Sequence, residues 1–300
     1  MGRAQSNAES FESVAGARII RSADELPLMY GCAFVPTMGG LHGGHLALVR
    51  QARCETERLA QGSKRPPVVV SVYVNPTQFN ERSDYERYPR DVAADTAMSA
   101  DAGADIVWAP DDDVVYPPGV EVPVPPIPPM AQKRGLEDEH RPGHLEGVCQ
   151  VCARLFRLIK PHLAVFGEKD WQQLQMIRWL VRDLGLGVEI LNGPTVRESD
   201  GLAMASRNRF LTPEERKRAI CVPRAWQEAQ RHRVSTDAEA AMRRVLSDAG
   251  ATIDYAAIRD AQLLSPLPGG EYTGPAGSAR AVLCARLGAV RLLDNAPWPG

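Results

Sequence analysis

Apolar runs of strand length alternate with amphipathic helical patterns through the first two-thirds of the chain. Strands are predicted at 33–36, 68–74, 105–109, 163–166 and 188–191, and helices at 45–60, 93–102, 148–159 and 172–184. Strands that alternate with helices at this spacing are typical of βαβ units and a parallel sheet. We therefore expect an α/β fold whose first domain, residues 1–195, is a Rossmann-like, doubly wound parallel sheet of five strands.

The pattern changes after Pro194, where two helical patterns precede three strand-like runs. The helices are expected at 213–231 and 236–249, and the strands at 253–258, 281–287 and 289–293. Helices followed by strands are typical of an α+β arrangement. Residues 196–300 are therefore predicted to form a smaller C-terminal α+β domain that closes over the site.

Proline is concentrated in one segment between these elements. The chain has 24 prolines in 300 residues, and seven of them lie in 117–129, PPGVEVPVPPIPP. Proline lacks the N–H that a helix or a central strand needs. We expect an extended, partly polyproline-II connection here.

Charge and composition favour a small-molecule partner. Lysine and arginine total 35 and aspartate and glutamate 37, which gives a net charge of −2 and disfavours nucleic acid. No run approaches the ~20 apolar residues of a membrane span, and residues 1–20 have no apolar core after a basic start. We expect a cytoplasmic protein with no membrane partner.

The six cysteines are too scattered for a disulfide framework. Only Cys149 and Cys152 are close, and their spacing resembles half of a zinc or redox motif. Because they fall within a helical apolar pattern, we interpret them as buried helix residues.

The most informative segment, residues 34–45, reads FVPTMGGLHGGH. A strand, a glycine-bearing turn and a helix follow one another here, and this arrangement directs backbone N–H groups and the helix dipole at phosphate. His42 and His45 can donate hydrogen bonds to phosphate oxygens. A zinc pair is the alternative, although no further ligand is adjacent.

Two more polar segments follow predicted strands, where open α/β sheets bind ligands. Asn75 and Gln78 come after the most apolar strand, and Lys169 and Gln173 come after the short strand at 163–166. The neutral amides suit a hydroxylated substrate, and the lysine suits a phosphate. The alternative for Lys169 is a solvated pair with Asp170.

The His-Gly-Gly-His turn resembles the signature of the nucleotidyltransferase superfamily that includes class I aminoacyl-tRNA synthetases. That resemblance implies a second, mobile phosphate-binding loop, and residues 204–208, MASRN, supply a basic residue in Arg207. Four segments together, PTMGGLHGGHLALV, VNPTQFNERSDYERYPRD, FGEKDWQQLQMIR and PTVRESDGLAMASRNRFL, resemble the pantoate–β-alanine ligase family, with RPGHLEGV and RLLDN in support.

The resemblance implies that pantoate and β-alanine condense to pantothenate, with ATP cleaved to AMP and pyrophosphate through a pantoyl adenylate. It implies catalytic roles for His45, as proton donor, and for His42, Lys169 and Arg207. Gln78, Gln173 and Asn75 would bind the substrate. The ATP site would comprise Met38, Gly39, Gly40, Leu41, His42, Gly43, Gly44, His45, Gly167, Glu168, Lys169, Asp170, Val196, Met204, Ala205, Ser206 and Arg207.

Further expectations concern cofactor, assembly and departures from the family. Mg²⁺ should be held mainly by ATP, with Asp95 as a candidate ligand, and the family implies a homodimer, for which strand 68–74 is a conceivable interface. Ala205 replaces a serine usual in the family, whereas Arg141, near the site, and Gln150 receive no functional interpretation. Two alternatives remain: a nucleotidyltransferase that moves AMP onto a phosphate, and an impaired relative that only binds ligands.

Overall fold

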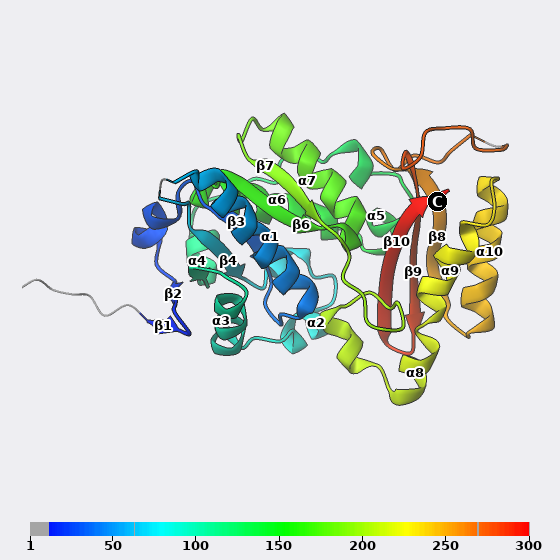
Figure 1. Ribbon diagram of the computed structural model, residues 1–300, viewed down its shortest axis with the longest axis horizontal. Helices are drawn as coiled ribbons and strands as arrows, with labels where there is room; N and C mark the ends of the chain where they lie inside the picture. Colours follow the sequence, from blue (N-terminus) through cyan, green and yellow to red (C-terminus); the bar gives the residue numbers. More distant parts are fainter. Residues whose placement is uncertain (1–11, 63, 269, 300) are drawn as a thin grey trace, which may run out of the picture.

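The computed structural model describes residues 12–62, 64–268 and 270–299, and its main feature is a seven-stranded sheet (Figure 1). The strand order is β1-β2-β5-β4-β3-β6-β7. All neighbours pair in parallel except β1 and β2. The strands are β1 (Ser13–Val14), β2 (Ala17–Ile20), β3 (Ala33–Thr37), β4 (Val68–Val72), β5 (Ile106–Trp108), β6 (Leu163–Gly167) and β7 (Glu189–Gly193).

Side chains along the central strands alternate between two cores. On β3, Ala33 and Val35 face one core and Phe34 faces the other, and β4 repeats the pattern with Val68 and Val70 opposite Val69. Successive residues of a strand point to opposite faces of its sheet, so both faces are covered. The doubly wound α/β prediction is therefore confirmed.

Helices cover both faces. Helices α1 (Gly43–Ala60) and α3 (Val92–Asp101) pack on one face, and α6 (His144–Ile159) and α7 (Trp171–Asp183) lie on the other (Figure 1). Shorter helices are α2 (Arg82–Arg87), α4 (Asp112–Val115) and α5 (Glu137–His140), with 3-10 turns η1 (Ala23–Met29), η2 (Pro76–Gln78), η3 (Pro129–Ala131), η4 (Glu168–Asp170) and η5 (Ser206–Phe210). Cys149 and Cys152 are buried in α6, as predicted.

The prediction of five strands was incomplete, because β1 and β2 extend the sheet. Strand β2 pairs in parallel with β5, with Arg18 opposite Ile106. Strand β4 lies in the middle of the sheet with all five residues buried, so these residues cannot themselves form a subunit interface, and an interface near that strand stays a prediction. The signal-peptide argument rests largely on residues 1–11, which lie outside the described residues.

A second, antiparallel sheet has the order β10-β9-β8, formed by β8 (Thr252–Asp260), β9 (Ala279–Leu287) and β10 (Val290–Trp298). Helices α9 (Cys221–Ala229) and α10 (Ser235–Asp248) pack beside it at the right of Figure 1. The single helix expected over 213–231 was wrong, since α8 (Pro213–Arg218) ends before α9 begins. Pro223 cannot donate a hydrogen bond back to the carbonyl of Ala219, which weakens a continuous helix.

A buried ion pair joins the two sheets. Arg291 of β10 makes a bidentate pair with Glu137 of α5 at 2.6 and 2.7 Å, and the Tyr255 hydroxyl donates to the same carboxylate at 2.7 Å. Although burial raises the pKa of Glu137, the hydrogen bonds and charge of Arg291 hold it at about 2. The pair is therefore ionised at neutral pH and fixes β10 against the first sheet.

The proline-rich segment lies along α6. Residues 121–128 have neither helix nor strand, as expected, and Gln150 of α6 donates to the carbonyl of Val122 at 2.6 Å. Gln150 thus acquires a structural role that the sequence did not indicate. No helix among the described residues is both long enough and apolar enough to cross a membrane.

Candidate active site

The glycine turn between β3 and α1 is held by two side chains. The Thr37 hydroxyl accepts from the Gly39 N–H at 3.1 Å, and the Asp95 carboxylate accepts from the amides of Gly40 and Leu41 at 2.9 Å each. Gly39 and Gly40 have φ of 82° and 61°, and a Cβ on Gly39 would lie 2.7 Å from the Asp95 carboxylate. Asp95, a candidate magnesium ligand from the sequence, therefore shapes the turn, because both of its oxygens accept backbone N–H groups; its role toward a metal stays a prediction.

His42 and His45 lie together at the start of α1, with ring centroids 4.1 Å apart. The Nδ1 atom of His42 caps the helix by accepting from the Gly44 N–H at 3.1 Å, so its proton must reside on Nε2 when the ring is neutral. The Nδ1 atom of His45 is buried without a hydrogen-bond partner among the described residues. A polar atom left in this state is available to a ligand.

Both imidazoles are neutral at pH 7 in the free protein. Burial, followed by the charge of Lys169, lowers the pKa of His42 to about 4. Burial, followed by His42 and Lys169, lowers the pKa of His45 to about 3. The neighbouring cation that opposes protonation is Lys169 of η4, whose Nζ is 3.9 Å from Asp170. An anion bound between these groups would favour their protonated forms.

Gln78 lies beside the glycine turn, where its amide contacts the Met38 sulfur at 3.0 Å. Its Oε1 accepts from Asn75 Nδ2 at 3.1 Å. Asn75 is 1% exposed, donates also to the Gly147 carbonyl at 3.2 Å and accepts from the Tyr116 hydroxyl at 2.9 Å. The amide of Asn75 is thus occupied within the protein, so Asn75 orients Gln78.

Helix α6 approaches η2, the turn that carries Gln78, so closely that no side chain separates the two backbones. A Cβ on Gly147 would lie 2.5 Å from the Thr77 carbonyl oxygen and 2.8 Å from the Cα of Gln78. His144, one turn earlier, contacts the Gln78 carbonyl through Nδ1 at 2.8 Å and Arg141 through Nε2 at 2.9 Å. Because arginine only donates, Nε2 accepts and Nδ1 carries the proton. Arg141, which had no predicted step, thus fixes the tautomer of the histidine behind Gln78.

The two adjacent glutamines of α7 have different surroundings. Gln172 is buried and accepts from the Glu137 N–H at 3.0 Å while donating to the Met130 carbonyl at 2.8 Å. Gln173 is half-buried and has no side-chain hydrogen bond within the described part of the chain. The side-chain amide of Gln173 is therefore not taken up by the described part of the protein, and its role in binding a substrate stays a prediction.

The loop after β7 returns to the glycine turn. The Met204 N–H donates to the Val196 carbonyl at 3.0 Å, and the Ser206 hydroxyl donates to the Gly40 carbonyl at 3.0 Å. A Cβ on Gly43 would lie 3.0 Å from the Met204 sulfur. Two of the predicted ATP-site residues of this loop, Met204 and Ser206, are thus brought to the turn, although 166 positions separate Ser206 from Gly40.

Arg207 is not in contact with the histidines. Its guanidinium pairs with Asp84 of α2 at 2.9 Å. The cation of this loop that lies beside the glycine turn is Arg209, whose Nη2 would be 3.3 Å from a Cβ on Gly40 and whose charge lowers the pKa of His42. The sequence contains this arginine two positions after the expected one, but nothing in its local pattern distinguishes it.

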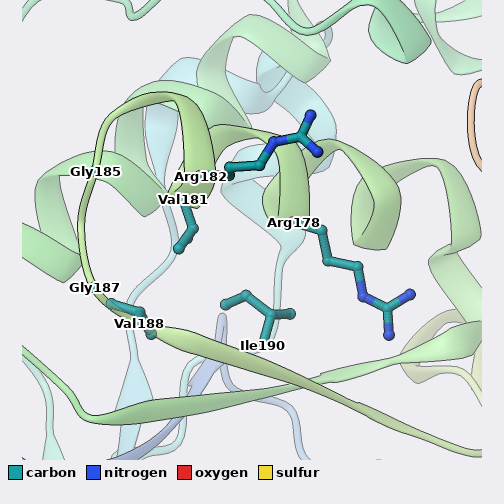
Figure 2. Close-up of a pocket in the computed structure, with 7 residues that line it drawn as sticks. All are labelled: Arg178, Val181, Arg182, Gly185, Gly187, Val188 and Ile190. Atoms are coloured by element: carbon teal, nitrogen blue, oxygen red, sulfur yellow. The ribbon is translucent and has the colours of Figure 1, made fainter.

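A shallow hollow of about 490 Å³ lies elsewhere (Figure 2). It is lined by residues around the start of β7, including Arg178, Arg182 and Ile190. The predicted site residues instead follow the carboxyl ends of β3, β4 and β6, which parallel pairing places at one edge of the sheet. The hollow is therefore separate from the site. No cluster of three or more metal-ligating side chains occurs in the described residues.

A doubly wound sheet with a histidine pair, a lysine and a basic loop at its carboxyl edge defines an enzyme that binds nucleotide phosphates. Comparison with protein families gives the particular group. The model described as Pantoate-beta-alanine ligase matches residues 11–297, and the chain belongs to this family.

Curated relatives and solved structures agree with this assignment. The chain is 47% identical over 267 residues to the pantothenate synthetase of a Nocardioides species, covering 88% of this chain and 77% of the relative. It superposes on the pantothenate synthetase of Thermus thermophilus with a TM-score of 0.83 at 42% identity, covering 93% of this chain and 98% of that one. A ligase from Francisella tularensis complexed with β,γ-ATP and β-alanine gives a TM-score of 0.73 at 27% identity, with coverage of 95% and 98%.

Proposed function

We propose that this protein condenses pantoate with β-alanine to give pantothenate, AMP and pyrophosphate by way of pantoyl adenylate. The observation that carries the proposal is the juxtaposition of phosphate-binding groups and neutral amides at one sheet edge. His42, His45 and Lys169 interact electrostatically, and the Gln78 amide contacts Met38 of the same glycine turn.

In the first step, a pantoate carboxylate oxygen attacks the α-phosphorus of ATP and the bond to the bridging oxygen of pyrophosphate breaks. Two anions must approach, and negative charge builds on the departing pyrophosphate. Lys169 supplies a fixed cation, and the two imidazoles supply N–H donors. The approach of the triphosphate should raise the pKa of His45 from about 3. His45 can then take up a proton and donate a hydrogen bond to the negative charge that develops on the pyrophosphate.

In the second step, the β-alanine amine attacks the acyl carbon, the bond between that carbon and the AMP oxygen breaks, and the nitrogen loses a proton to the departing AMP or to water. AMP is a competent leaving group, so this step depends mainly on holding the amine and the acyl carbon together. The Francisella tularensis ligase binds β-alanine, and the same substrate is proposed here.

The pantoate subsite is assigned to Gln78 and Gln173, with Asn75 orienting Gln78. Neutral amides can bind hydroxyls and a carboxylate without the strong attraction for a second phosphate that a basic pocket would have. An enzyme that transfers AMP to a phosphate would need such cations at this position. The ligase therefore fits the site better than that alternative.

The late loop and the metal complete the ATP site in this proposal. Arg207 would exchange Asp84 for the triphosphate as the loop closes, joining Val196, Met204, Ala205 and Ser206. Mg²⁺ would arrive on the ATP oxygens and neutralise part of their charge. Asp95 has its carboxylate directed to the turn amides, so the protein contributes little to the metal directly.

Organisation beyond the site is also proposed. Strand β7 ends at Gly193 and α8 begins at Pro213, which suits a boundary between two domains at residues 195 and 196. A cytoplasmic, homodimeric enzyme is proposed from the family resemblance and from six cysteines that carry free thiols. Sedimentation of the purified protein tests the dimer.

The decisive experiment is exchange of labelled pyrophosphate into ATP, measured with pantoate present and β-alanine absent. We expect exchange that depends on pantoate, because the adenylate forms and reverses. A folded sample that shows no exchange, or that transfers AMP to a phosphorylated acceptor instead, would overturn the ligase proposal.

A further inference from the structure

Asn295 of β10 lies against the turn that carries Lys169, although 126 positions separate the two residues. The side chain is 4% exposed. Its Nδ2 donates to the carbonyl oxygens of Glu168 at 3.0 Å and of Lys169 at 2.7 Å. Both amide protons are therefore used to hold the backbone of η4.

The orientation of this amide is fixed from the other side. The Nε of Arg280 in β9 donates to the Asn295 Oδ1, and because arginine has no acceptor atoms, the oxygen must face Arg280 and the nitrogen must face the turn. Arg280 is itself held over the Trp171 ring at 3.5 Å and lies 3.8 Å from the Glu168 carboxylate. The second sheet thus directs the two N–H donors of the Asn295 amide, in a fixed orientation, at the backbone of η4.

The other side-chain contacts of this turn hold Glu168, which accepts from Asn192 and lies beside Arg280. Helix η4 spans only three residues, and the Lys169 ammonium is 3.9 Å from Asp170, a neighbour in the same turn. The two hydrogen bonds from Asn295 reach the backbone itself, so they help to fix the position of Lys169 and hence the reach of its ammonium toward the histidine pair.

We propose that Asn295 is a positioning residue for Lys169 in the adenylation step, so that the second sheet helps set the phosphate site of the first. This inference rests on the phosphate role of Lys169 in the proposed function. A displacement of about 1 Å at such a group can reduce the rate by roughly 100-fold. The effect should appear in the chemical step, because Asn295 touches neither Gln78 nor Gln173.

The test is a double-mutant cycle on pantoate-dependent pyrophosphate exchange with Asn295→Ala, Lys169→Ala and the pair. Asn295→Ala should lower kcat by about 10- to 100-fold with the pantoate KM within about twofold of its original value. In the Lys169→Ala background it should change kcat by less than about threefold, since no ammonium remains to be positioned.

Two further variants control for folding. Glu239→Ala removes an acceptor of the Ile258 N–H and a partner of Arg259, in contacts that do not include η4, and should leave exchange unchanged. Arg280→Lys removes the Nε that orients Asn295 but keeps the Asn295 amide, so it should lower kcat by a smaller factor than Asn295→Ala does. This variant keeps the inference testable if Asn295→Ala folds poorly.

The outcomes separate this inference from the proposed function. If the unaltered protein shows no pantoate-dependent exchange, the proposed function fails. If it does exchange, equal effects of Asn295→Ala with and without Lys169, or an effect confined to the pantoate KM, would overturn the positioning role alone.

Discussion

Replacement of Gly147 by alanine tests whether the pantoate subsite depends on direct contact between the backbones of α6 and η2. In most helix interiors this substitution stabilises a protein by about 0.5–1 kcal/mol, because glycine loses more conformational freedom on folding. At this position the new Cβ would lie 2.5 Å from the Thr77 carbonyl oxygen. Helix propensity should therefore raise the free energy of unfolding of the variant, whereas the close contact with Thr77 should lower it.

The magnitude follows from the contact distances. Ordinary contact with a Cβ begins near 3.4 Å, so the helix and the turn must separate by about 0.9 Å. Overpacking of this kind costs about 1–3 kcal/mol, which leaves a net loss of about 1 kcal/mol, and at most about 2.5 kcal/mol, after the gain in helix propensity. The same movement draws Gly147 away from Asn75 and displaces Gln78, and misplacement by about 1 Å can cost up to 100-fold in catalysis.

Thermal denaturation and exchange kinetics measure the two consequences. We expect Gly147→Ala to lower Tm by about 1–4 °C and to raise the pantoate KM by about 10-fold or more, with the ATP KM little changed. Glu146→Ala, at the adjacent position of the same helix, serves as the control and should change neither. A Gly147→Ala protein with an unchanged or higher Tm and an unaltered pantoate KM would refute the close-approach argument.

Other predictions concern the phosphate site and pH. His45→Ala should lower the exchange rate by about 100-fold or more while Tm stays near its original value; near-full activity would remove His45 from the catalytic set. Burial lowers the pKa of His144 to about 4, below the ~6.5 of an unfolded chain, so this group's share of stability is present above pH 6.5 and is lost as the pH falls toward 4. The stability lost from this group amounts to about 2 kcal/mol by pH 5, and urea unfolding should show that His144→Gln reduces the pH dependence; an equal slope would contradict the assignment. Ala205→Ser should raise kcat by about two- to tenfold, since a neutral hydrogen bond contributes about 0.5–1.5 kcal/mol; an unchanged rate would mean that the loop has adapted to alanine. Arg209→Ala should raise the ATP KM by about two- to fivefold at low salt and less at high salt, whereas a matched effect of exposed Lys217→Ala would show only a general loss of charge.

The central strands and long helices were predictable because each carries its own periodic signal. Val68, Val69 and Val70 identify a buried strand in a window of a few residues. Strand β2, ARII, is too short for such a signal and exists because it pairs with β5. Its recognition requires the tertiary structure, since the pairing partner lies far along the chain.

In the candidate site, too, some residues carry a local sequence signal and others depend on contacts between distant segments. Local sequence indicated His42, His45, Lys169 and Gln78, each of which follows a strand. The supporting contacts were not predictable, because they join distant segments: Asp95 with the turn amides, and Arg141 through His144 to Gln78. Asn75 was expected at the substrate, but its position before a buried turn gave no indication that its amide is occupied by the protein itself.

The Asp95 carboxylate has a consequence for ligand affinity. It provides negative charge to the glycine turn when no nucleotide is bound, so the turn keeps its shape without a phosphate to organise it. Ordering a flexible segment on binding subtracts from affinity, whereas a segment ordered beforehand avoids that cost. In the proposed function, ATP would therefore meet a preorganised surface, and its binding free energy would remain available for closing the Arg207 loop.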